Sequence, residues 1–152
     1  MESNIDVLYI EDNQDDINLT LRAFKKNNFN VNIKIIQDGE EAYNFLIKNK
    51  DSLLNSNNLP KVILLDLNLP KINGLQLLKA LKQDEDLKLI PVVILTSSDD
   101  ENDVVRSYKY GTNGYIVKPV HFENFVKAIA DLGVYWFFLN YTIKDIYLNS
   151  MR

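Results

Sequence analysis

Five short apolar runs, separated by stretches long enough to form a helix, constrain the fold of this chain more than any other feature. The runs are rich in Val, Ile and Leu and cover residues 7–10, 31–36, 62–65, 92–95 and 115–117. The first, third and fourth are apolar throughout, as expected for strands that helices cover on both faces of a parallel sheet. The second alternates polar and apolar residues, which predicts a strand at the sheet edge.

Amphipathic segments between and after these runs predict five helices. In the first, Ile17, Leu21 and Phe24 recur at helical spacing, and Asp15 and Asp16 fall in the expected first turn. The other helix starts are marked by a capping box at Asp38 and Glu41, by Gly74, by a capping box at Ser98 and Glu101, and by His121. Residues 55–60 are predicted to form a surface loop. Strand and helix alternate five times, which predicts an α/β fold with one doubly wound, five-stranded parallel sheet.

Length and composition narrow the classes of function. The 152 residues fit one domain, predicted over residues 1–133, and an aromatic extension over residues 134–152. The chain has no cysteine, so it has no disulfide and no thiolate metal site. The net charge of -4 argues against a general nucleic-acid surface. No apolar stretch approaches the roughly 20 residues that cross a bilayer. We therefore expect a cytoplasmic protein with no membrane or nucleic-acid partner.

Polar residues directly follow four of the apolar runs: Glu11 and Asp12, Asp66, Thr96, and Lys118. The carboxyl ends of parallel strands share one edge of a sheet, so we expect these side chains to meet there. Crowded carboxylates repel each other and need raised pKa values or a cation. An oxygen-only ligand set favours Mg²⁺. Taken singly, each acidic residue could cap a helix and Lys118 could be a solvated lysine, but their joint occurrence favours a functional site.

These residues resemble the receiver domain of two-component response regulators. The resemblance runs from about Asp6 to Ile129 and includes Glu11-Asp12, Asp66 with Pro70 and Gly74, Thr96, and the run from Gly114 to Pro119. It implies a flavodoxin-like sheet with the strand order 2-1-3-4-5 and a cis peptide bond between Lys118 and Pro119.

The resemblance also implies a chemistry for these positions. Asp66 would accept a phosphoryl group from a phosphohistidine on a sensor histidine kinase. Asp12, Asp66 and the backbone carbonyl of Asn68 would coordinate Mg²⁺, with Glu11 helping through water. The Thr96 hydroxyl and Lys118 would receive the phosphoryl oxygens.

Tyr115 lies three residues before Lys118, where the family places its switch aromatic. On this interpretation, phosphorylation draws Thr96 toward the phosphoryl group and opens space for the Tyr115 ring to turn. The surface made by the fourth helix, the fifth strand and the fifth helix would then change. The alternative is that Tyr115 is an ordinary tyrosine of an edge strand.

The last twenty residues are rich in aromatic and aliphatic side chains, among them Val134, Tyr135, Trp136, Phe137, Phe138 and Leu139. Two interpretations stay open: the tail folds back over the domain, or the last helix and the tail form a homodimer interface. This extension and the polar stretch before Pro60 resemble, more weakly, single-domain regulators of bacterial phytochrome-type kinases. That resemblance implies a kinase of this type.

Two rival classes of function are weighed against a phosphorylated switch. A phosphatase of the haloacid-dehalogenase type usually has a second Asp, its general acid, two residues after the nucleophile. This chain has Asn68 at that position. We therefore do not expect an enzyme. A receiver-like interaction module that works without phosphorylation normally lacks the acceptor aspartate, the acidic pair or the lysine. All are present here, and this module is kept as the alternative. A flavin is disfavoured because Glu11 and Asp12 would repel its phosphate.

Overall fold

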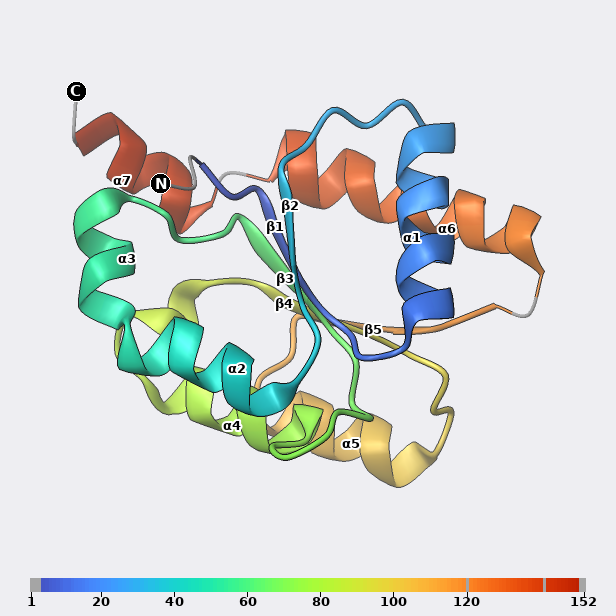
Figure 1. The fold of residues 1–152 in the computed structure, drawn as a ribbon, viewed down its shortest axis with the longest axis horizontal. Coiled ribbons are helices and arrows are strands. Elements are labelled where there is room, and N and C mark those ends of the chain that lie inside the picture. Colours follow the sequence, from blue (N-terminus) through green and yellow to red (C-terminus); the bar gives the residue numbers. More distant parts are fainter. Residues whose placement is uncertain (1–3, 120, 141, 151–152) are drawn as a thin grey trace.

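A computed structural model describes the backbone of residues 4–119, 121–140 and 142–150, and the side chains of these residues except 137–139 and 147–150. Its centre is a five-stranded sheet in which all neighbouring strands are parallel, in the order β2-β1-β3-β4-β5 (Figure 1). The strands are β1 (Val7–Ile10), β2 (Ile33–Ile36), β3 (Val62–Leu65), β4 (Val92–Thr96) and β5 (Gly114–Val117). The predicted fold class and strand order are confirmed.

Helices cover both faces of the sheet. They are α1 (Gln14–Lys26), α2 (Gly39–Tyr43), α3 (Lys50–Ser56), α4 (Gly74–Gln83), α5 (Glu101–Lys109), α6 (Phe122–Gly133) and α7 (Ile143–Ser150). Shorter helical turns are η1 (Asn44–Lys48), η2 (Leu87–Leu89) and η3 (Val134–Leu139). Helices α1 and α6 pack together on one face, and α2, α4 and α5 lie on the other (Figure 1).

Two apolar cores, one on each face, bury the central strands. Side chains alternate along β1, so that Leu8 and Ile10 enter one core and Val7 and Tyr9 enter the other. Strands β1, β3 and β4 are buried along their whole length, whereas β2 at the edge is only partly buried. The difference between continuous and alternating apolar runs therefore predicted the position of these strands correctly.

The segment before β3 differs from its prediction. Helix α3 extends to Ser56, so residues 55–60 are not wholly a loop, and Leu59 and Pro60 are buried rather than on the surface. Asn57 adopts a left-handed conformation, with φ of 55°, that ends α3. The chain then turns inward because Leu59 joins the core beneath α3.

Local details of the later helices also differ from the sequence interpretation. The residue that caps α5 is Asp100, whose side chain accepts a hydrogen bond from the Asn102 N–H. Ser98, the predicted cap, instead donates its hydroxyl to Asp103. None of the described peptide bonds is cis, so the implied cis bond before Pro119 is wrong.

The C-terminal segment continues the last helix and then turns back along the domain. Helix α6 passes into η3 without leaving helical backbone angles at Gly133 and Val134. Helix α7 follows, and Lys144, only 1% exposed, donates a hydrogen bond of 2.6 Å to the carbonyl oxygen of Leu59. Ile143 packs on the core next to it. The start of α7 thus packs against its own domain. Among the described residues, no helix is long and apolar enough to cross a membrane.

Candidate functional site

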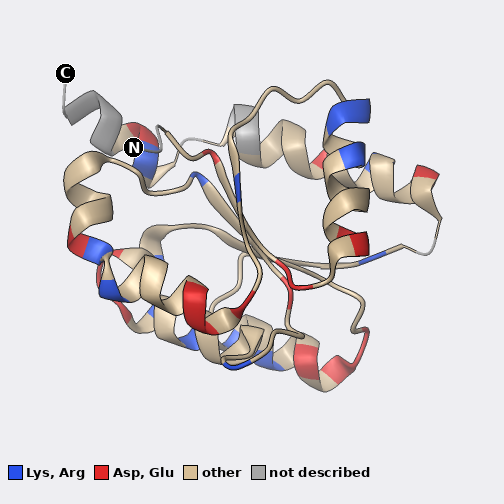
Figure 2. Ribbon diagram, in the orientation of Figure 1, with Lys and Arg blue, Asp and Glu red and all other residues tan. Residues whose placement is uncertain are grey.

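The carboxyl ends of four strands bring the predicted site residues to one edge of the sheet. Ile10 pairs with Leu65, Leu65 pairs with Ile94, and Thr96 pairs with Val117, so the residues that end or follow these strands lie side by side. Figure 2 shows acidic segments where β1 and β3 end. The structure therefore collects Glu11, Asp66, Thr96 and Lys118 in one place.

Lys118 is the cation at the centre of this site. Its ammonium forms a very close ion pair with Glu11 Oε1, lies 2.9 Å from Asp16 Oδ2 and lies 3.5 Å from Asp66 Oδ2. The Lys118 side chain is 8% exposed and those of Glu11 and Asp66 are 0% and 7% exposed, so water screens these two pairs only weakly. One ammonium thus faces carboxylates from β1, α1 and β3.

Burial and crowding shift the pKa values of the acidic groups in opposite directions. Burial raises the pKa of Glu11 to about 8, and its hydrogen bond with Asp66 acts in the same direction, while Lys118 opposes both. Burial also disfavours ionisation of Asp66, but the hydrogen bonds from Glu11 and Thr96 and the charge of Lys118 outweigh it and lower the pKa of Asp66. Within this pair, the surroundings therefore favour the charged form of Asp66 more than that of Glu11.

Glu11, Asp12 and Asp66 form a set of oxygen donors suited to a hard divalent cation. Their carboxylate oxygens lie within 4.8 Å of one another. Asp12 is exposed, whereas Glu11 and Asp66 are buried, so the set opens to solvent on one side. Three carboxylates at this spacing repel each other, and Lys118 compensates only part of their charge. The donor set and its uncompensated charge fit Mg²⁺ or Mn²⁺.

Neighbouring polar groups orient the Asp66 carboxylate. The fully buried Thr96 side chain helps to lower the pKa of Asp66, and the Asn68 N–H lies 3.3 Å from Asp66 Oδ1. The Asn68 side chain is exposed beside the site, and the Ser98 N–H lies 3.4 Å from Thr96 Oγ1. These contacts fix the direction in which the reactive oxygen of Asp66 points.

Gly74 allows the start of α4 to approach the end of β3. A Cβ atom at Gly74 would lie 2.3 Å from the carbonyl oxygen of Asp66 and 2.5 Å from Leu67 Cα. The Gly74 N–H also donates to the carbonyl oxygen of Leu67. Because Gly74 has no side chain, α4 can begin directly against the backbone of Asp66.

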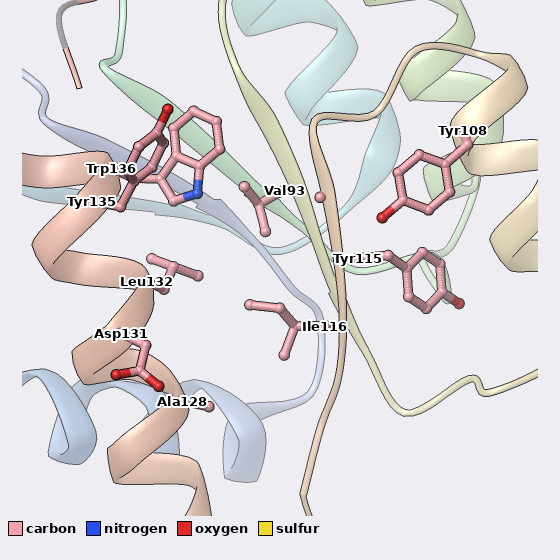
Figure 3. A pocket seen from close by; sticks show the side chains of 10 residues that line it. Val93, Tyr108, Tyr115, Ile116, Ala128, Asp131, Leu132, Tyr135 and Trp136 are labelled. Carbon is pink, nitrogen blue, oxygen red and sulfur yellow. The ribbon is translucent and has the colours of Figure 1, made fainter. Parts of the chain in front are cut away.

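Tyr115 lies apart from the carboxylates, on the edge strand β5. Its hydroxyl donates a hydrogen bond of 2.8 Å to the carbonyl oxygen of Ser98, and burial raises its pKa. Its ring lines a pocket of about 540 Å³ between α5, β5 and α6, with Tyr108 on one side and Trp136 on the other (Figure 3). Tyr115 thus joins the loop after Thr96 to an aromatic surface.

Sequence reasoning missed two contributors to the site. Asp16 was assigned only to the first turn of α1, yet it binds Lys118 from 102 positions away. The Tyr9 hydroxyl lies 3.0 Å from Thr20 Oγ1 and 3.4 Å from Glu11 Oε1, behind the ion pair. Asp16 has a sufficient explanation as a charge in the first turn of a helix, so the sequence carries no signal for its pairing with Lys118.

Comparison with known proteins settles which family has this arrangement. The pattern of the response regulator receiver domain matches residues 7–130, most of the chain. The chain belongs to the response regulator receiver family. Two-component receivers are phosphoacceptors that histidine kinases phosphorylate, and the acidic cluster of this chain is compatible with that function.

Similar proteins include the response regulator Rcp1 and the cyanobacterial phytochrome response regulator RcpA. Response regulator Rcp1 of Synechocystis sp. is 35% identical over 130 residues, 86% of this chain and 87% of Rcp1. The structure of the phosphorylated cyanobacterial phytochrome response regulator RcpA superimposes with a TM-score of 0.81 at 31% identity, covering 93% of this chain and 99% of RcpA. The Mn²⁺-bound form of Rcp1 gives a TM-score of 0.79 at 35% identity, with 90% and 96% covered.

A regulatory protein from Methanothrix harundinacea shows comparable similarity. The probable methanogenesis regulatory protein FilR2 of Methanothrix harundinacea is 35% identical over 130 residues, which cover 86% of this chain and 82% of FilR2. The similarity to the regulators above therefore spans nearly the whole of each protein.

Proposed function

We propose that this receiver takes a phosphoryl group from the phosphohistidine of a sensor kinase onto Asp66 and thereby switches a protein-interaction surface. The observation that carries the proposal is the setting of Asp66. Its side chain is 7% exposed, its pKa is lowered by its neighbours Glu11, Thr96 and Lys118, and one of its oxygens lies 3.5 Å from the ammonium of Lys118. A carboxylate held in a defined orientation beside a cation has the setting that a nucleophile needs.

In the proposed step, an oxygen of Asp66 attacks the phosphorus atom and forms an acyl phosphate. The bond between phosphorus and the histidine nitrogen breaks, and the nitrogen keeps the electron pair. Lys118 and the Thr96 hydroxyl lie where they can bind the phosphoryl oxygens. The reaction moves one group onto this chain, so the proposed activity is that of a phosphoacceptor rather than of an enzyme with turnover on other molecules.

Mg²⁺ is the proposed cofactor of this site. Glu11, Asp12, Asp66 and the backbone carbonyl of Asn68 would hold it, and the Mn²⁺-bound form of Rcp1 supports a divalent cation here. When bound, the cation supplies positive charge that neutralises the phosphoryl oxygens. The chain's own contribution is to keep three carboxylates close together and to leave Asp12 open to solvent.

The interaction surface proposed to switch is the aromatic pocket beside β5. Tyr115 is tied to Ser98, whose N–H lies next to the Thr96 hydroxyl, so a movement of Thr96 would pull on the tyrosine. Tyr108 and Tyr135, both about half exposed, flank the pocket. Exposed aromatic side chains of this kind are typical of protein interfaces.

The proposed partner is a cytoplasmic histidine kinase of phytochrome type. The similarity to RcpA over nearly its whole length supports this choice. Because kinases of this class consume ATP, the receiver would work in the same compartment, the cytoplasm.

We further propose a homodimer that uses the extension of the last helix, residues 134–152 beyond the receiver of residues 1–133. Val134 and Tyr135 are 50% and 51% exposed, which leaves apolar surface on η3 while Lys144 and Ile143 of α7 pack inward. Light scattering of Val134→Asp tests this interface. Leu89→Asp is the control because Leu89 is 48% exposed and lies in η2, outside the extension. A dimer that survives Val134→Asp places the contact elsewhere.

The phosphoacceptor assignment is tested by intact-protein mass after incubation with phosphoramidate, with and without Mg²⁺. We expect a gain of one phosphoryl group that needs Mg²⁺ and that alkali removes. Asp66→Asn should abolish the gain, whereas Asp51→Asn, at an exposed position of α3, should retain it. Labelling of Asp66→Asn would remove Asp66 as the acceptor. No labelling of the unaltered protein would favour the interaction module that works without phosphate.

A further inference from the structure

Asp16 contacts the site without belonging to its donor set. Its carboxylate lies 2.9 Å from Lys118 Nζ, while the oxygens that group around a cation come from Glu11, Asp12 and Asp66. Asp16 reaches Lys118 from the first turn of α1, where the Asn13 side chain caps its backbone N–H. Figure 2 shows acidic residues at this end of α1 and basic residues at the other.

The distances show where Lys118 is held. A charge-assisted N–H···O hydrogen bond is about 2.7–2.9 Å long. The contact of Lys118 with Asp16 meets this length, whereas the 3.5 Å to Asp66 does not. Two carboxylates of the β1–α1 segment, those of Glu11 and Asp16, therefore hold the ammonium more closely than the acceptor does.

Phosphorylation of Asp66 would give the Lys118 ammonium a further anionic group to bind. A phosphoryl group adds negative charge at Asp66 and presents oxygens that need a cation. Glu11 and Asp66 belong to the donor set that a divalent cation would occupy, but Asp16 does not, so it keeps its hold on Lys118. Its negative charge also repels the added phosphoryl charge. Both effects disfavour the phosphorylated form.

We infer that Asp16 is a positioning residue that competes with the phosphoryl group for Lys118. This inference rests on the function proposed above, in which Lys118 binds a phosphoryl oxygen. Asp16 thereby sets how strongly phosphorylation at Asp66 is favoured. Its side chain is 35% exposed, so water screens the effect and its size is that of a partly exposed ion pair.

The test is the affinity of the metal-loaded protein for beryllofluoride, a stable mimic of the phosphoryl group, measured by ¹⁹F NMR at saturating Mg²⁺. Asp16→Asn should bind beryllofluoride about two- to fivefold more tightly than the unaltered protein, which is the range for a partly exposed pair. Asp15→Asn is the matched control, because it removes the same charge from the same helix turn at an exposed side chain. It should change the affinity less than twofold, roughly, as a screened charge does. Asp16→Glu should restore the original affinity.

A double-mutant cycle separates competition for Lys118 from a general effect on α1. In a Lys118→Ala background, Asp16→Asn should raise the affinity less than it does when Lys118 is present, because the group for which Asp16 competes is gone and only the screened charge repulsion remains. An equal gain with and without Lys118 would overturn the inference, as would unchanged or weaker binding by Asp16→Asn alone. If the unaltered protein itself does not bind beryllofluoride with Mg²⁺, that result contradicts the proposed phosphoacceptor function rather than the role of Asp16.

Discussion

The Tyr115 hydroxyl donates a hydrogen bond of 2.8 Å to the carbonyl oxygen of Ser98, and this bond links the edge strand to the loop that leaves the phosphoacceptor site. The Ser98 N–H lies 3.4 Å from Thr96 Oγ1, and the Thr96 hydroxyl bonds to Asp66. Asp66 and the aromatic pocket beside β5 are therefore joined through three consecutive polar contacts. A chain of this kind can carry a small displacement from one end to the other.

Replacing Tyr115 by Phe should weaken this link without altering the acceptor. The variant keeps the ring in the pocket but loses the bond to Ser98, so phosphorylation by phosphoramidate should stay within about twofold while the response of the pocket falls. The single tryptophan, Trp136, lines the same pocket, and its fluorescence measures that response.

Tyr108→Phe is the control for this experiment. Tyr108 lines the same pocket from α5 but is 53% exposed, and its replacement should leave the Trp136 signal unchanged. Equal fluorescence changes in the unaltered protein and in Tyr115→Phe would show that the bond to Ser98 carries no signal.

Lys118→Ala should separate phosphorylation from its consequence. Without the ammonium, Asp66 can still be phosphorylated, but the segment that follows β5 has no cation to be drawn toward the phosphoryl oxygens. We expect a mass gain of one phosphoryl group, formed more slowly, with little change in Trp136 fluorescence. A full fluorescence response would contradict the role proposed for Lys118.

The buried Glu11 should make stability depend on pH in the absence of metal. Its pKa is about 8 in the folded protein, against an ordinary value of 4.5. Between these two values the folded chain holds more protons than the unfolded chain, so the free energy of unfolding should fall as the pH rises through this window. The slope can reach about 1.4 kcal/mol per pH unit.

Denaturant unfolding with a chelator at pH 5.5, 6.5 and 7.5 measures this slope, and Glu11→Gln should flatten it. The apparent affinity for Mg²⁺ should change in the opposite direction and increase up to about pH 8, because a ligating carboxylate must be ionised. An identical slope in Glu11→Gln would assign the dependence to other groups.

Gly74→Ala should damage both stability and phosphorylation. The new methyl group would meet the backbone of Asp66 and Leu67, which cannot move aside as a flexible side chain does. Overpacking of this kind costs about 1–3 kcal/mol. Displacement of Asp66 should also slow its labelling by phosphoramidate. Gly114→Ala is the control, since a methyl group there meets Val93 at an ordinary 3.6 Å. If both variants behave alike in denaturant unfolding and labelling, the close approach at Gly74 is unimportant.

The sequence by itself determined the architecture, because the pattern of burial is local. Continuous apolar runs at residues 7–10, 62–65 and 92–95 predicted the buried strands, and the alternating run predicted the edge strand β2. The topology of parallel sheets then placed Glu11, Asp66 and Lys118 at one edge, where the structure brings them together.

Features that depend on contacts between distant segments were decided only by the tertiary structure. Leu59 is buried because α3 and α7 close over it, although the polar residues before it predicted a surface loop. Asp100 rather than Ser98 caps α5 because Ser98 is drawn into contacts with Tyr115 and Asp103. The burial of Leu59 and the cap of α5 both depend on contacts between distant segments, which local sequence propensity does not describe.

The pairing of Asp16 with Lys118 is the clearest case. From the sequence, Asp16 has a sufficient explanation as a favourable charge at the start of a helix. Only the packing of α1 beside the end of β5 brings its carboxylate to 2.9 Å from an ammonium 102 positions away. The residue types of the site follow from the sequence because strand ends converge, whereas the partner of each charge depends on side-chain geometry that only the folded chain fixes.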